Sequence, residues 1–163
     1  MNKINIKFEK ISKRGFTIFE LLITVSVAVI IGTIGLISFS NVRFYQDLKL
    51  TTQEMAVVLR NAQDRAISQE SGSGWGVYFQ NPSSGDSFYE LFSGASYPGT
   101  AVSRNFLRSR IKFENPPINS SLTVIFSPIS GLPNSPATIK IFLSSDSSAS
   151  STIIVGGNGK IEY

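Results

Sequence analysis

Hydrophobic and polar positions first mark out an apolar segment near the start of the chain. Residues 16–39 form a largely apolar run in which Glu20 is the only ionisable residue. About 20 apolar residues in an α-helix are enough to cross a lipid bilayer. The pattern therefore predicts a membrane-spanning helix over residues 16–39. A carboxylate inside such a helix is costly, so Glu20 needs a specific partner.

After this run the apolar positions recur at helical spacing, with charged residues between them. The apolar residues are Phe44, Leu48, Met55, Val58, Leu59, Ala62, Ala66 and Ile67. This spacing is typical of an amphipathic helix. We therefore expect one helix from about Phe16 to Ser68, with residues 40–70 as its amphipathic continuation lying on a sheet. Ser71-Gly72-Ser73-Gly74 should end it.

From Trp75 onward the pattern changes to short strands. Polar breaks rich in Gly, Pro and Ser separate them, and Gly156-Gly157-Asn158-Gly159 is a hairpin signal. The predicted fold class is α+β, with a long amino-terminal helix packed on an antiparallel β-sheet domain over residues 71–163. The candidate strands are Gly76 to Gln80, Ser87 to Phe92, Leu107 to Phe113, Leu122 to Ser127, Ala137 to Leu143, Ser151 to Val155 and Lys160 to Tyr163.

Residues 1–15 form a basic segment ahead of the apolar run. They carry five of the 15 Lys and Arg residues and one of the 11 Asp and Glu residues of the chain. A basic flank keeps the amino end of a membrane helix in the cytoplasm. A secretory signal would show a cleavage site after its apolar core, whereas the plausible cut here lies before the core, after Gly15. Without residues 1–15 the chain is neutral, so its alkaline pI is weak evidence for an acidic partner.

Composition argues against catalysis. The chain has no Cys and no His, so it lacks a thiol nucleophile, a disulfide, the commonest metal ligand and the commonest general base. Asp86 and Glu90 have no partners that complete a catalytic set, and we expect them to be solvated edge charges. Asp146 lies in a serine-rich segment that we expect to be a flexible loop without calcium-ligand spacing. We therefore expect no enzymatic activity, no cofactor and no metal site.

The sequence Lys13-Arg14-Gly15-Phe16-Thr17-Ile18-Phe19-Glu20-Leu21-Leu22 resembles the processing site of type IV prepilins and type II secretion pseudopilins. The resemblance implies that residues 1–15 are a leader peptide, that prepilin peptidase cuts between Gly15 and Phe16, and that the new amine of Phe16 is N-methylated. It also implies that Glu20 acts in assembly.

Glu20 can set the axial register of a filament. A carboxylate in apolar surroundings is tolerable where an ammonium group shares them, and the new terminal amine of a neighbouring subunit supplies one. The other interpretation is that Glu20 is an interfacial acid at the end of an ordinary membrane anchor.

The remainder of the chain resembles the GspH/FimT group of minor pilins and pseudopilins. The matching segments are Phe126 to Gly131, Thr138 to Phe142, Gly156 to Tyr163 and Gln63 to Ile67. The resemblance implies a subunit of a type IV pilus or a type II secretion system. Its implied partners are other pilin or pseudopilin subunits, prepilin peptidase, and the inner-membrane platform protein and motor ATPase.

The resemblance also implies a location. The subunit is expected to cross the inner membrane once, with its amino end in the cytoplasm, and then to enter an extracytoplasmic filament. The alternative is a plain membrane-anchored domain that never polymerises.

A group of cations suggests a second function. Arg108, Arg110 and Lys112 alternate along the predicted strand 107–113, with Arg104 nearby, so they are expected to share one face. Such a stripe can neutralise phosphates, and the resemblance to FimT implies DNA binding in a competence pilus as an alternative function. The other interpretation is a solvated face or contacts with acids of another subunit. In the FimT group the DNA contacts are associated with arginines near the carboxyl end, which in this chain reads Gly159-Lys160-Ile161-Glu162-Tyr163.

Overall fold

The structure is a computed structural model that describes residues 15–163, apart from the side chains of residues 34–41. The predicted leader, except for Gly15, lies outside the described residues. The chain divides into two compact units, Met1–Ser40 and Asn41–Tyr163, and the elements of each are described by themselves. One long helix, α1 (Ile18–Ile67), precedes a short 3-10 turn at Glu70–Gly72 and eight strands among the described residues.

The bounds of α1 agree with the predicted helix to within two residues at each end. The Thr17 hydroxyl accepts a hydrogen bond from the Glu20 backbone N–H at 3.2 Å, which caps the first turn. A threonine followed three residues later by a glutamate is a sequence signal for this type of cap. At the other end Gln69 and Ser71 adopt left-handed backbone angles, with φ of 55° and 62°, and the helix stops.

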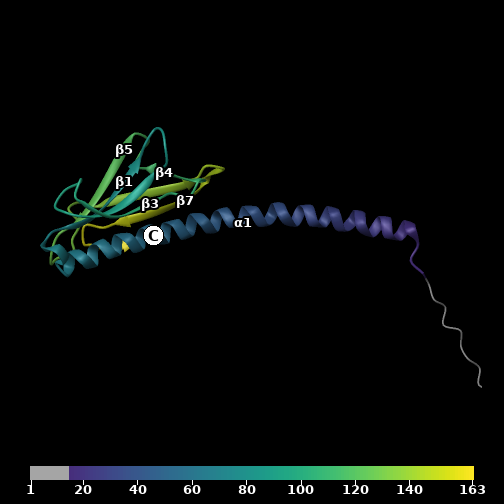
Figure 1. Ribbon diagram of the computed structural model, residues 1–163, viewed down its shortest axis with the longest axis horizontal. Helices are drawn as coiled ribbons and strands as arrows, with labels where there is room; N and C mark the ends of the chain where they lie inside the picture. The colour runs from purple at the N-terminus through teal and green to yellow at the C-terminus, as the bar shows by residue number, and fades with distance from the viewer. Residues whose placement is uncertain (1–14) are drawn as a thin grey trace, which may run out of the picture. The chain divides into compact units, whose positions relative to one another are not determined.

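The strands form two four-stranded antiparallel sheets (Figure 1). The first has the order β3-β2-β1-β5 and consists of β3 (Thr100–Phe106), β2 (Phe88–Ser93), β1 (Trp75–Asn81) and β5 (Ser120–Phe126). The second has the order β4-β6-β7-β8 and consists of β4 (Ile111–Asn115), β6 (Ala137–Leu143), β7 (Asp146–Val155) and β8 (Ile161–Glu162). The predicted α+β class with antiparallel pairing is confirmed.

Two predictions about the strands are wrong. Residues 107–110 form a turn rather than the start of a strand, closed by the hydrogen bond from the Ile111 N–H to the Arg108 carbonyl at 2.8 Å. The preceding strand β3 was not predicted, because almost all of its residues are exposed and it has no apolar alternation. Asp146 begins strand β7 rather than lying in a loop, since pairing with β6 overrides the weak strand preference of the serines.

The apolar stripe of residues 42–67 packs under the sheets as predicted. Leu48, Met55, Leu59, Ala62 and Ala66 are buried in one core. Each fully buried large side chain contributes about 1.5–3 kcal/mol. Ile67, at the end of α1, remains exposed. The sheets contribute Val77, Phe79, Phe113, Val124, Phe126, Ile139, Ile141 and Ile153 to the same core.

Polar contacts fix the loops at one end of this domain to α1. The Gln63 amide donates hydrogen bonds to the carbonyl oxygens of Gly131 and Gly159, both at 2.9 Å. Gly131 has a φ of +60°, and a Cβ there would lie 2.6 Å from the Ile67 side chain, so only glycine fits without rearrangement.

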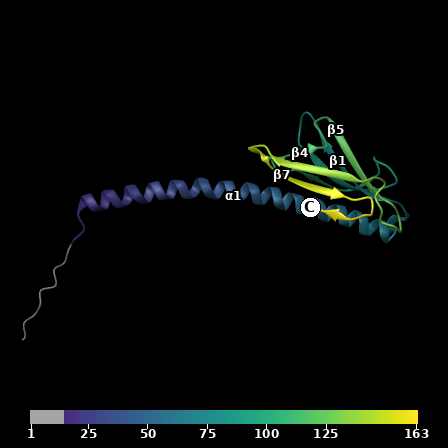
Figure 2. The same ribbon diagram turned by 180° about the vertical axis from the view of Figure 1, so that it is seen from behind.

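The predicted hairpin at Gly156–Gly159 is confirmed, with the Gly156 N–H bonded to the Lys160 carbonyl at 2.8 Å. Both ribbon views show the carboxyl terminus beside α1 (Figures 1 and 2), where the Arg60 guanidinium donates to the Ile161 carbonyl at 3.3 Å.

Candidate functional site

The first part of α1 has an apolar surface without cover. Ile18 is 84% exposed, and the large apolar side chains that follow it are each about half exposed or more. They occur at consecutive as well as alternate positions, so they surround the helix rather than form one stripe. An apolar surface of this extent marks a site of interaction. The residues are Ile18, Phe19, Leu21, Leu22, Ile23, Val25, Val27, Val29, Ile30 and Ile31.

The hydroxyl groups of this segment are satisfied within the helix. Thr24 donates to the Leu21 carbonyl at 2.9 Å, and Ser26 donates to the Leu22 carbonyl at 2.8 Å. Thr33 donates to the Val29 and Ile30 carbonyls, both at 2.9 Å. These polar residues therefore do not oppose burial of the segment in apolar surroundings.

The Glu20 carboxylate differs from these hydroxyl groups. It lies in the first turn of α1, where the helix dipole favours a carboxylate, and its side chain is exposed. In residues 15–163 no ion pair involves it. Covering this segment with apolar groups would remove water from the carboxylate as well. The carboxylate then requires a cation from another molecule, or it must lose its charge.

Gly15 and Phe16 precede α1 in non-helical, exposed backbone. Among the residues that the structure describes, no heavy atom lies within 4 Å of the place where a Cβ on Gly15 would stand. Lys13 and Arg14, which precede the bond between Gly15 and Phe16, lie outside the described residues. Cleavage and N-methylation at this position remain predictions.

No helix within the described part of the chain has both the length and the mean hydropathy of a membrane span. The predicted membrane-spanning helix over residues 16–39 includes residues 34–39, and the structure does not describe the side chains of those six residues.

The four cations of the predicted basic stripe do not share one strand face. Arg108 and Arg110 belong to the turn before β4, and Lys112 is exposed on β4. Arg108 forms ion pairs with Asp47 at 2.6 Å and with Glu54 at 2.7 Å. The Arg110 guanidinium lies 4.1 Å above the Phe44 ring. Arginines 108 and 110 therefore contact α1.

Glu90 is buried, which corrects the expectation that it is a solvated edge charge. Its carboxylate accepts a hydrogen bond from the Arg104 Nε at 2.6 Å, and the Arg104 guanidinium lies 4.3 Å above the Phe88 ring. Burial and the neighbouring Glu90 raise the pKa of Tyr97, which stacks on Tyr78 with ring centroids 3.7 Å apart. Residues 90 and 104 are directly opposed across β2 and β3, so their pairing depends on strand β3, which the sequence pattern does not predict.

Asp86 is exposed, as expected. Asp146 instead accepts hydrogen bonds from the Ser148 hydroxyl at 2.6 Å and the Tyr45 hydroxyl at 2.8 Å. The bonds from Ser148 and Tyr45 lower the pKa of Asp146, and the same carboxylate raises the pKa of Tyr45. Among the described residues no group of three or more His, Cys, Asp or Glu side chains is placed to hold a metal ion.

Sequence reasoning missed two features of the site. The sequence does contain the signal for the Thr17 cap, because a threonine stands three residues before Glu20. The acids Asp47 and Glu54, seven residues apart on α1, receive Arg108 from a distant turn. Helical periodicity predicts that these two acids share one face of α1, but the approach of Arg108 depends on the tertiary fold.

No family model matches the chain, and no curated protein matches its sequence. Its structure resembles two crystal structures of the type IV minor pilin FimU from Pseudomonas aeruginosa, with TM-scores of 0.51 and 0.53 and 15% identity in both. The matches cover 71% and 72% of this chain and 90% and 87% of the FimU chains. The chain has a type IV minor pilin-like fold. In this pilin-like fold the amphipathic part of α1 supports the sheets, while residues 18–31 keep an uncovered apolar surface.

Proposed function

We propose that this protein is a minor pilin or pseudopilin, a structural subunit of a type IV pilus or type II secretion system. The observation that carries the proposal is the apolar surface that surrounds α1 from Ile18 to Ile31 and holds a single carboxylate. Packing among the equivalent helices of other subunits covers this surface. Before assembly the lipid of the inner membrane covers it, with the amino end of the chain in the cytoplasm.

Leader removal completes the site. Prepilin peptidase cuts between Gly15 and Phe16, and the new amine, once N-methylated, lies four residues before Glu20. In a filament the amine of one subunit and the Glu20 carboxylate of its neighbour share low-dielectric surroundings, where opposite charges attract strongly. The pair fixes the axial step between subunits. The platform protein and motor ATPase supply the work of extraction.

DNA binding in a competence pilus is the second candidate. It needs arginines that are free to neutralise phosphates. Arg104 and Arg108 instead pair with acids of the same domain, and Arg110 lies on an aromatic ring. We therefore rank assembly before DNA binding. The third candidate, an anchored domain that does not polymerise, gives no role to a lone carboxylate at the start of the apolar helix.

The amino terminus of the protein recovered from filaments tests this proposal. Intact-mass measurement and amino-terminal sequencing should find a chain that begins at Phe16 and carries one methyl group. Gly15→Leu should block cleavage, because the peptidase recognises the glycine, whereas Gly32→Ala should be processed normally. A filament protein that retains residues 1–15 contradicts the proposal.

A further inference from the structure

Strand β3 (Thr100–Phe106) has a free backbone edge. It is an end strand of its sheet and pairs only with β2. In residues 15–163 no other strand pairs with it, and the backbone hydrogen bonds of the loops do not reach it. All of its residues except Asn105 are exposed. A row of backbone donors and acceptors is therefore open to a further strand.

Most of β3 lacks the features that protect a sheet edge. Natural edge strands are commonly protected by proline, by lysine or by very short length. β3 is seven residues long and contains neither proline nor lysine. Its single cation, Arg104, is turned onto the sheet face, where it pairs with Glu90. A bulge is another protective feature of edge strands, and β3 has one at Val102, which lies between the partners of Leu91 and Phe92, so the uninterrupted part of the edge is Ser103–Phe106.

A groove with a volume of about 530 Å³ borders β3 at Asn105 and has a mainly apolar lining. One wall is α1, where Leu50 and Val57 are two turns apart on one face and about half exposed. The other side contains Tyr89 and Asn105, which are opposed across β2 and β3. Ser103 and Asn105 are the β3 residues on this side, opposite buried Leu91 and Tyr89, and both are too small to cover the α1 wall.

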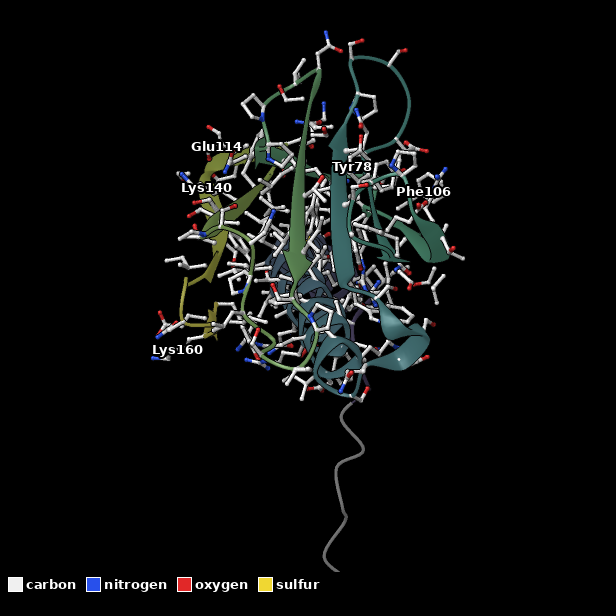
Figure 3. The ribbon with its side chains drawn as sticks, turned by 90° about the vertical axis from the view of Figure 1, so that its left-hand side faces the viewer. Tyr78, Phe106, Glu114, Lys140 and Lys160 are labelled. Atoms are coloured by element: carbon white, nitrogen blue, oxygen red, sulfur yellow. The ribbon has the colours of Figure 1, made fainter. Side chains whose placement is uncertain are left out.

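The opposite face of β3 is also open to contact. Phe106 is 60% exposed, and its ring centroid lies 5.9 Å from that of Phe88. Figure 3 shows Phe106 at one margin of the domain, on the side away from Glu114, Lys140 and Lys160. Exposed aromatic rings are enriched in protein interfaces.

We propose that β3 is a docking edge for an extended segment of a partner protein, which adds a fifth strand to the sheet. Only an extended backbone matches the unpaired donors and acceptors of β3. Successive side chains of that strand point to opposite faces of the sheet, so every second one enters the groove between α1 and β3. Leu50, Val57, Val58 and Tyr89 make the groove mainly apolar, although Gln53 and Glu54 also line it, so the side chains that enter it are mainly apolar. Backbone pairing supplies affinity, and the groove supplies specificity.

A synthetic peptide of alternating threonine and valine, about as long as β3 and labelled with fluorescein, is the probe. Titration into the full-length protein in detergent micelles should raise the fluorescence anisotropy. Binding should also slow amide hydrogen exchange in residues 100–106. Two further peptides carry backbone N-methyl groups on all valines or on all threonines. Since alternate N–H groups of a strand point to opposite edges, one methylated peptide should lose about tenfold or more in affinity and the other should keep it.

Two matched helix variants locate the peptide. Val57→Lys places a charge in the groove and should weaken binding about tenfold. Val42→Lys changes a similarly exposed residue of α1, outside the groove, and should leave binding unchanged. Fluorescence of Trp75, the only tryptophan, verifies folding of both variants.

Three results would overturn the proposal. The first is absence of peptide binding to the folded protein, and the second is equal binding of both N-methylated peptides, which would show that no strand is added. The third is self-association of the chain through β3, which would show that the edge belongs to a second copy. None of these results bears on leader cleavage or filament assembly, so this inference and the proposed function fail separately.

Discussion

The Arg108 guanidinium lies 2.7 Å from the Glu54 carboxylate and thereby joins the turn before β4 to the middle of α1. The other terminal nitrogen of Arg108 contacts Asp47, two turns earlier on the same helix face, at 2.6 Å. One planar cation thus spans two acids of α1, a geometry that suits arginine better than lysine. The contact attaches the sheets to the helix outside the apolar core.

Arg108→Ala should lower the free energy of unfolding by at most about 1 kcal/mol, because all three side chains are partly exposed and solvent screens the pairs. Urea unfolding of the full-length protein in detergent, followed by Trp75 fluorescence, measures the change. The difference should shrink at high salt. Lys112→Ala removes an exposed cation of β4 and serves as the control. An equal effect of the two variants, or no effect of salt, contradicts the assignment.

The buried Glu90 carboxylate depends on Arg104. Arg104→Ala should lower the urea midpoint, because it leaves a buried carboxylate without its cation. Adding Glu90→Leu should restore part of the loss, since an apolar side chain needs no partner at that position. A double-mutant cycle measures the coupling between the two positions. Additive effects of the single changes would show that the two side chains do not interact.

Two adjacent threonines of α1 should respond differently to the same substitution. Thr51 and Thr52 are both buried, but the Thr51 hydroxyl has no hydrogen-bond partner within the described part of the chain, whereas the Thr52 hydroxyl donates to the Leu48 carbonyl at 2.8 Å. Thr51→Val should stabilise the domain by about 1 kcal/mol, because it removes an unsatisfied polar group at nearly constant shape. Thr52→Val gains apolar contact but loses a hydrogen bond, so it should be neutral or destabilising. Urea unfolding compares them, and a destabilised Thr51→Val would be the contrary result.

Tyr89 makes stability depend on pH in the alkaline range. Burial raises its pKa from 10.0 to about 12, with a further contribution from Glu54, while Arg108 acts in the opposite direction. The folded state therefore favours the protonated phenol. Its contribution is fully present below pH 10 and is lost as the pH rises toward 12, by about 1–2 kcal/mol after allowance for solvent screening. Tyr89→Phe, compared with the unchanged chain in urea unfolding at pH 9 and pH 12, should lose less stability over this interval. Equal losses in both proteins contradict the shift.

Local patterns were enough to predict the helix and the fold class. Leu48, Met55, Leu59 and Ala62 are separated by seven, four and three residues, a helical spacing that local sequence shows, and all four residues reach the core. The turn signal at Gly156–Gly159 is equally local, and it forms the last hairpin.

Features that depend on distant pairing could not be predicted in this way. Strand β3 lacks an apolar alternation because it is an exposed edge, so the partnership of Arg104 with Glu90 could not be found. The expected alternation of Arg108 and Arg110 assumed a strand where the backbone turns. The buried state of Glu90 follows from tertiary packing on the sheet, whereas isolation of Glu20 in an apolar run is visible in the sequence itself.

Incorporation of Glu20→Gln into filaments tests the central claim most directly. In cells that produce the variant beside the unchanged chain, the ratio of the two is measured in the membrane and in sheared filaments. The account predicts normal leader cleavage and equal membrane levels, but about tenfold or greater depletion of the variant from filaments, because the neighbouring amine loses its carboxylate. Ser26→Ala, which removes a hydroxyl bonded within its own helix, should enter filaments normally. Equal incorporation of Glu20→Gln and the unchanged chain would contradict the account.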